Sequence, residues 1–131
     1  MKIWICGLLA AGLLSGCAAG IQGNSPTVSY TVPRGYLAVY HRAQDQAQKC
    51  LRGQNAYRVQ GKLDRASGSG SVDVVAPFGS NVVARTQFRA LDSGHTRVTQ
   101  SVWGRSIWDS KALAAMRESV YMDTSECTAY L

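Results

Sequence analysis

The sequence has few residues of the kinds that metal, redox or acid–base chemistry needs. Its 131 residues include two histidines and four cysteines, with no C-x-x-C pair. Neither His41 nor His95 has a cysteine, serine or acid at a spacing that builds a ligand set or a catalytic dyad, and the eight acidic residues are scattered singly. The sequence therefore predicts no metal site, no cofactor and no enzymatic activity.

Long hydrophobic runs are also missing. The longest apolar run, residues 3–14, has 12 residues, whereas a membrane-spanning helix needs about 18–20. This excludes a multi-helix membrane protein. Hydrophobic residues make up 46% and charged residues 17% of the chain, with a net charge of +6. That balance is typical of a globular protein, and at this length one domain is expected.

The N-terminus has the layout of an export signal. Met1-Lys2 supplies a positive start, the apolar run follows, and small residues come next. Leu14-Ser15-Gly16-Cys17 resembles the lipobox of bacterial lipoprotein precursors, in which cleavage falls just before the cysteine. The resemblance implies a signal peptide over residues 1–16 and a Cys17 that carries a diacylglycerol on sulfur and an acyl chain such as palmitate on its new amine. The alternative is a plain secretory signal with Cys17 free or disulfide-bonded.

The resemblance also implies a location. Three acyl chains give stable membrane anchoring without a spanning helix. Ala18 and Ala19, rather than Asp, follow Cys17, which in lipoproteins of bacteria with two membranes implies export to the outer membrane. A lipid-anchored protein facing the periplasm is expected, and that compartment disfavours nucleic acid as a partner.

Two cysteines remain after these assignments. Cys6 would leave with the signal peptide and Cys17 would carry lipid, so only Cys50 and Cys127 are left. In an oxidising periplasm they most simply form one disulfide. A two-cysteine metal or redox site is the alternative, but no histidine or third cysteine lies at ligand spacing.

Residues 17–33 are small, polar and punctuated by glycine and proline, which predicts the lipidated cysteine followed by a flexible tether. Within them, residues 27–32 alternate and fit a short edge strand. Residues 34–131 are expected to form one domain. It begins with a helix whose apolar face runs at helical spacing and whose polar side carries Arg42, Asp45, Gln46 and Lys49. The apolar face is formed by Tyr36, Tyr40, Ala43, Ala47 and Cys50.

Four alternating runs follow, over residues 57–64, 71–78, 82–91 and 96–103, with turn residues between them. The face predicted to be buried includes Val72, Val74, Ala76, Phe78, Val82, Ala84, Thr86, Phe88, Thr96, Val98, Gln100 and Val102. A second helix, capped by Ser106 or Asp109, runs to about Asp123, and Cys127 continues its apolar face. The pattern predicts a two-layer α+β sandwich: helix, four-stranded antiparallel meander, helix, with both helices on one sheet face.

The opposite face of this sheet is basic. The alternation places Arg58, Lys62, Arg85, Arg89 and Arg97 on it, with Asp64 and Asp73 as partial partners. We interpret it as a candidate anion-binding face for lipopolysaccharide phosphates, phospholipid headgroups or an acidic protein. The alternative is a solvated face whose charges prevent sheet-to-sheet association.

Aromatic residues suggest a second kind of site. A cleft between helices and sheet is a hypothetical binding place for a small apolar or glycan ligand. Its candidate lining is Tyr36, Tyr40, Trp103, Trp108, Tyr121 and Tyr130. The favoured function is a non-enzymatic binding or structural accessory of the envelope. A periplasmic carrier of lipid or glycan is the first alternative, and an envelope hydrolase is less favoured.

Overall fold

Five antiparallel strands form one sheet in the order β1-β5-β4-β3-β2, with two helices against it. The structure is a computed structural model that describes residues 20–130; the predicted signal peptide and Cys17 lie outside these residues. The elements are β1 (Thr27–Val32), α2 (Tyr36–Cys50), β2 (Arg58–Asp64), β3 (Ser69–Val75), β4 (Val82–Asp92), β5 (His95–Val102) and α3 (Ser110–Met122). The predicted α+β architecture is confirmed, with a fifth strand added to the meander.

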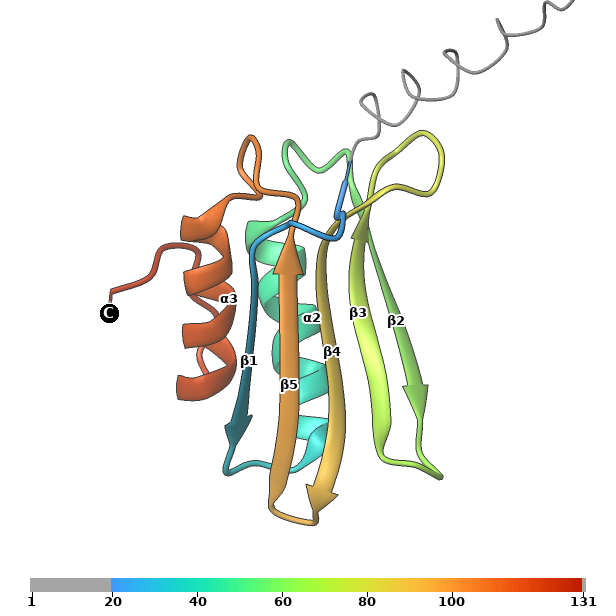
Figure 1. The fold of residues 1–131 in the computed structure, drawn as a ribbon, viewed down its shortest axis with the longest axis vertical. Helices are drawn as coiled ribbons and strands as arrows, with labels where there is room; N and C mark the ends of the chain where they lie inside the picture. Colours follow the sequence, from blue (N-terminus) through green and yellow to red (C-terminus); the bar gives the residue numbers. More distant parts are fainter. Residues whose placement is uncertain (1–19, 131) are drawn as a thin grey trace, which may run out of the picture.

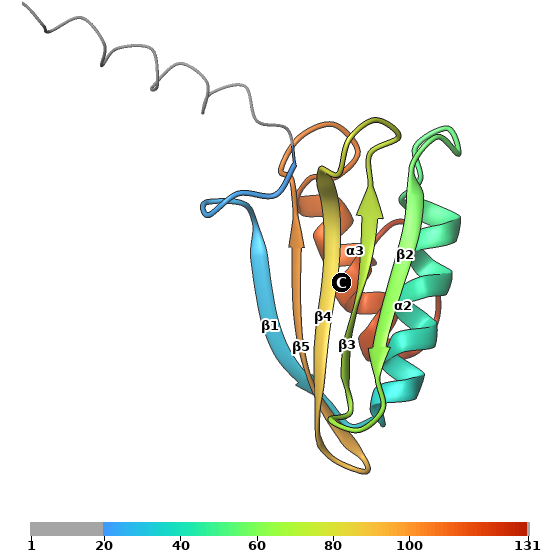
Figure 2. The same cartoon turned by 90° about the vertical axis from the view of Figure 1, so that its right-hand side faces the viewer.

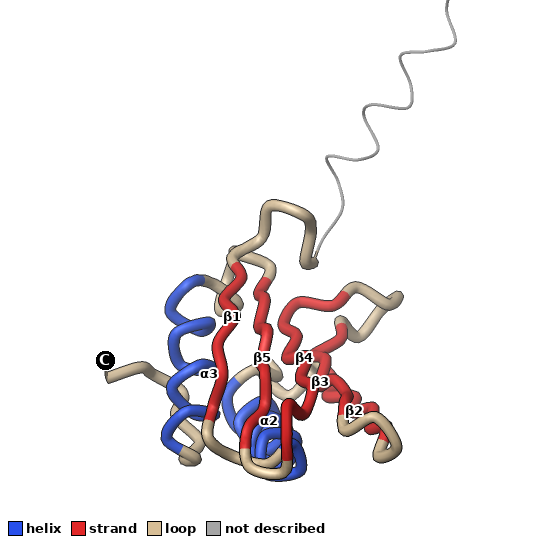
Figure 3. Tube along the Cα trace, turned by 60° about the horizontal axis from the view of Figure 1, so that its bottom comes forward, coloured by secondary structure: helices blue, strands red, loops and turns tan. Residues whose placement is uncertain are grey.

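Both helices cover the same face of the sheet, which gives two layers (Figures 1 and 2). Helix α2 packs against β2, β3, β4 and β5, whereas α3 packs against β5 and β1. In the tube view the helices lie together on one side of the strands, and the other side carries no helix (Figure 3). Within residues 20–130, neither helix has the length and apolar character needed to cross a bilayer.

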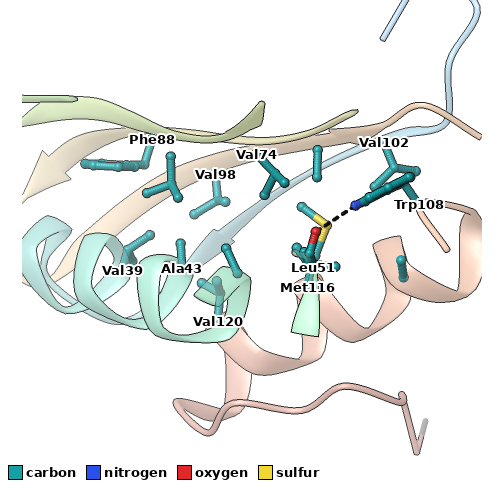
Figure 4. Close-up of a cluster of buried hydrophobic side chains, with 14 of the residues drawn as sticks. Val39, Ala43, Leu51, Val74, Phe88, Val98, Val102, Trp108, Met116 and Val120 are labelled. Atoms are coloured by element: carbon teal, nitrogen blue, oxygen red, sulfur yellow. Dashed lines mark hydrogen bonds between the residues drawn. The ribbon is translucent and has the colours of Figure 1, made fainter. Parts of the chain in front are cut away.

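The core lies between sheet and helices, where period-2 side chains of the strands meet the apolar faces of α2 and α3 (Figure 4). The predicted register is confirmed, because the alternating set of Val72, Val74, Thr86, Phe88, Val98 and Val102 is buried. A register slip of one residue would have turned these side chains to water. Gln100 is buried among them, with its polar atoms satisfied by Tyr30, Thr86 and the carbonyl of Met116.

The prediction of a tether over residues 17–33 fails from residue 20 onward, whereas the short edge strand predicted within it at residues 27–32 is confirmed as β1. Strand β1 pairs with β5 over six residues, from Thr27 opposite Ser101 to Val32 opposite Thr96. Before it, the Ile21 amide donates to the carbonyl of Val82 at 2.8 Å, and Gly20 is buried. Residues 20–32 therefore belong to the folded domain. The sequence suggested a tether because these residues are small and polar. Their structure depends on β5, which lies about 70 residues further along the chain.

Strand β3 begins and ends earlier than predicted, at Ser69 and Val75, and its register shifts at Val75. The irregularity buries Val75 and Val83, which the alternation had placed on the outer face. It also moves Phe78 out of the strand and into the β3–β4 loop. There its side chain is 87% exposed, so its prediction as a core residue is wrong.

After α3 ends, residues 123–127 of the C-terminal tail lie along α2, and the Tyr130 amide donates back to Glu118 of α3. Asp109 caps α3 by accepting from the amides of Lys111 and Ala112, and the helix stops at Met122. Cys127 therefore belongs to the tail and does not continue the face of α3 as predicted. The predicted disulfide itself is present: Cys127 bonds Cys50, with their Cα atoms 5.1 Å apart.

Candidate functional site

The candidate site is the helix-free face of the sheet, hereafter the open face. The strand registers align its side chains in three rows across all five strands. From the end nearest residue 20 these are Thr27–Ser101–Arg85–Asp73–Gln60, then Ser29–Thr99–Gln87–Ser71–Lys62, then Thr31–Arg97–Arg89–Ser69–Asp64. All fifteen positions are polar. Four of the five predicted basic residues lie in these rows, on the face that the sequence alternation predicted.

Arg85 is the least available of the four cations. Its Nε and Nη2 atoms donate to the two carboxylate oxygens of Asp73, at 2.8 and 3.0 Å. The Asp73 side chain is only 13% exposed, and these hydrogen bonds raise the pKa of Arg85 further above its ordinary value. A bidentate pair of this kind is geometrically specific and strong. Arg85 is thus a partner for Asp73 rather than a free anion ligand.

Arg89 and Arg97 have the opposite character. They lie directly opposite each other on β4 and β5, and both are exposed. Like charges facing each other across a strand pair are destabilising. Among residues 20–130 neither arginine makes an ion pair, and the same holds for Lys62 in the neighbouring row. Asp64 lies in the same row, two strands from Arg89, and makes no ion pair with either arginine; its Oδ1 accepts from the amides of Ala66 and Ser67.

Arg58 separates from the other four. It is the first residue of β2, at the end of the sheet where residue 20 lies, and its NH1 donates to the carbonyl of Ala76 at 3.2 Å. The sequence grouped it with the basic face by alternation alone. Its place in β2 keeps it on the same side of the strand as Gln60 and Lys62, beyond the three rows and at the end of the sheet.

A hydroxyl border completes the open face on its β1 side, and sequence analysis missed it. Thr27 and Ser101 share a hydrogen bond of 3.0 Å, and Ser29 and Thr99 share one of 2.9 Å. These pairs form only because β1 joins the sheet, so the sequence signal was the alternation of residues 27–32. The border offers neutral donors beside the cations of β4 and β5.

The predicted aromatic cleft does not form. Trp108 is buried at the end of the sheet, where its Nε1 donates to the carbonyl of Leu51 at 2.9 Å (Figure 4). Tyr121 and Tyr130 lie away from the sheet and are 45% and 78% exposed. Between α2 and the sheet the described residues leave a cavity of about 10 Å³, enough for one water molecule at most. Tyr36 and Tyr121 line two separate open hollows of about 440 and 380 Å³, so the predicted residues do not meet in one cleft.

The two histidines lie apart. His41 is exposed on α2, whereas His95 is the first residue of β5, with its Nδ1 2.9 Å from a carboxylate oxygen of Asp92. Sequence spacing had suggested no partner for either. The contact lowers the pKa of Asp92, mainly through the hydrogen bond with His95. Within the described chain, no three His, Cys, Asp or Glu residues gather as a metal ion would require.

The chain matches no protein-family model and no curated protein sequence.

Proposed function

We propose that the protein is a lipid-anchored accessory component of the bacterial outer membrane, facing the periplasm, which works by binding rather than catalysis. The anchoring half of the proposal rests on Leu14-Ser15-Gly16-Cys17 directly after a 12-residue apolar run. The disulfide between Cys50 and Cys127 supports it, because such bonds persist in oxidising compartments such as the periplasm.

The binding half rests on one observation: Arg89 and Arg97 face each other across β4 and β5, and no acidic residue in the described part of the chain pairs with them. An anion placed between the two guanidinium groups would turn their mutual repulsion into two charge-assisted contacts. Thr31 and Ser69 flank this pair in its row, and Lys62 and Asp64 lie one strand further out on β2. The arrangement fits a phosphate of lipopolysaccharide or a carboxylate cluster on an envelope protein.

Substituting the predicted lipid site tests the anchoring. Cells fed an alkyne analogue of palmitate should label the wild-type protein and deliver it to the outer-membrane fraction. Cys17→Ala should abolish the label and leave the signal peptide uncleaved by the lipoprotein-specific peptidase. Cys6→Ala is the matched control and should be labelled like the wild type. Label that persists on the Cys17→Ala protein would overturn the proposal.

Charge reversal tests the anion binding. The Arg89→Glu, Arg97→Glu double variant should bind the phosphorylated, lipid-free core oligosaccharide of lipopolysaccharide about tenfold or more weakly than wild type, because each lost charge-assisted contact is worth about 1.5–3 kcal/mol. Arg58→Glu with Arg105→Glu makes the same change of net charge away from the pair and should retain binding. Equal loss in both variants would show that only net charge matters. If wild type fails to bind the oligosaccharide but crosslinks an acidic envelope protein through this face, the partner is the protein.

A further inference from the structure

The first described residue fixes which end of the domain lies near the predicted anchor. The Ile21 amide is hydrogen-bonded to Val82, and Gly20 is buried against Asn81 and Val82. Two residues, Ala18 and Ala19, lie between Cys17 and residue 20, which makes three Cα-to-Cα steps. A fully extended chain spans at most about 3.6 Å per residue, so the Cα atoms of residues 17 and 20 are no more than about 11 Å apart.

Four loops come together at this end, hereafter the anchor end: residues 20–26, 51–57, 76–81 and 103–109 (Figures 1 and 2). Hydrogen bonds tie them to one another and to the ends of the sheet. The Trp103 amide donates to Val83, Trp108 Nε1 donates to Leu51, and Arg58 donates to Ala76. The loops therefore form one surface rather than four independent segments.

Two large apolar side chains are exposed on the anchor end. Phe78 in the β3–β4 loop is 87% exposed, and Ile107 in the β5–α3 loop is 46% exposed. Burying aromatic and aliphatic side chains at the boundary between headgroups and acyl chains is how proteins attach to a membrane surface. Neither side chain packs in the core of the described domain, so both can insert into a membrane surface.

The charges of the anchor end match an anionic surface. Its loops and the adjoining first residue of β2 carry Arg52, Arg58 and Arg105 against one acid, Asp109. Asp109 keeps its negative charge while it caps α3, and the three arginines outnumber it. Arg52 and Arg58 donate to backbone carbonyls, which orients their guanidinium groups without neutralising them. Anionic headgroups attract such clusters.

We propose that the anchor end docks on the headgroups of the leaflet that holds the acyl chains, with Phe78 and Ile107 inserted at the interface and the three arginines against lipid phosphates. The inference rests on the proposed function, since it takes Cys17 to carry the lipid. A headgroup layer about 5–7 Å thick lies within reach of a spacer of about 11 Å. The strands then run away from the membrane and present the open face sideways.

This orientation separates the two basic surfaces. Arg89 lies seven positions along β4 from Val82, and a strand rises about 3.3 Å per residue, so the Arg89–Arg97 pair stands roughly 23 Å from the anchor end. That distance exceeds the screening length of about 8–10 Å at ordinary ionic strength. The Arg89–Arg97 pair is therefore too far from the anchoring leaflet to bind its headgroups. The anion that this pair binds must lie beside the domain.

Tryptophan fluorescence tests the docking on the processed, membrane-extracted protein. It is reconstituted into vesicles of phosphatidylethanolamine and phosphatidylglycerol that contain a phosphatidylcholine brominated high on its acyl chains. Phe78→Trp places a probe on the anchor end, and Leu91→Trp places one near the β4–β5 turn, where Leu91 is 52% exposed. After subtraction of the emission of Trp103 and Trp108, Trp at position 78 should lose most of its emission, whereas Trp at position 91 should keep its emission.

Charge reversal in the Phe78→Trp background supplies the second readout. Arg58→Glu with Arg105→Glu should reduce the quenching, whereas Arg89→Glu with Arg97→Glu should leave it unchanged. Acylated protein in which the two probes are quenched equally would overturn the docking while the proposed anchoring stands. Absence of acyl chains on Cys17, read from the mass of the same preparation, would overturn the proposed function and this inference with it.

Discussion

Gln46 of α2 donates a hydrogen bond from Nε2 to the backbone carbonyl of Glu126, 3.1 Å away. One turn earlier Arg42 bonds Asp123 and Ser125, and one turn later Cys50 bonds Cys127. Positions 42, 46 and 50 share one side of the helix because they are four residues apart. The C-terminal tail is thus attached to three successive turns of α2.

Removing the disulfide should lower the stability of the domain. The bond joins positions 77 residues apart, and the chain-entropy description gives an upper value of about 4.5 kcal/mol for a loop of this size. The contacts of Arg42 and Gln46 with the tail remain after reduction, so a loss below this value is expected. Thermal unfolding with and without reductant measures it. Identical melting temperatures, with both thiols shown to be free, would contradict a stabilising role.

Arg85 and Arg89 should respond in opposite directions to loss of charge. Arg85→Ala leaves the nearly buried carboxylate of Asp73 without its partner and should cost about 1–3 kcal/mol of unfolding free energy. Arg89→Thr removes the repulsion with Arg97 and should add about 0.2–1 kcal/mol. Urea unfolding of both variants checks the signs, and the gain from Arg89→Thr should shrink at high salt. A destabilised Arg89→Thr protein would refute the repulsion.

The tail contacts should weaken in acid. Hydrogen bonds from Ser125 and then Lys49 lower the pKa of Asp45 below its ordinary value of 3.8. A carboxyl with a depressed folded pKa contributes stability that is present above its unfolded pKa and is lost as pH falls through the folded value. Wild type should therefore lose more stability than Asp45→Asn as pH is lowered below 3.8. Parallel pH profiles for the two proteins would exclude this contribution.

Tyr30 should make the core sensitive to alkali. Burial raises its pKa well above the ordinary value of 10.0, and its hydroxyl donates to Gln100 at 2.6 Å. Stability from the neutral phenol is present below pH 10.0 and is lost as pH rises toward the folded value. Tyr30→Phe should cost about 1–3 kcal/mol at neutral pH, and its deficit should narrow above pH 10.0 as wild type weakens. A constant deficit would argue against burial of an ionisable phenol.

The sequence predicted features that depend on local periodicity. The alternation around Val74, Phe88 and Val98 identified the buried face and hence the open face, and cysteine arithmetic identified the disulfide. It failed where a distant partner decides the structure. Gln46 was assigned to solvent because only the tail, 80 residues later, satisfies its amide.

The candidate site shows the same division. Alternation grouped Arg85, Arg89 and Arg97 correctly on one face, since each lies on a well-formed strand. It did not show that Arg85 is held by Asp73, because cross-strand partners depend on register and not on composition. The β3 irregularity near Val75, which the alternation hid, placed Phe78 on the anchor end.

The central claim is that Cys17 becomes the lipidated N-terminus of the mature protein. Intact-mass and fragmentation analysis of the protein extracted from outer membranes tests it most directly. The account predicts a chain that lacks residues 1–16, begins at Cys17 and carries a diacylglycerol and an amide-linked acyl chain on that residue. A mature chain with any other N-terminus, or with an unmodified Cys17, would contradict the account.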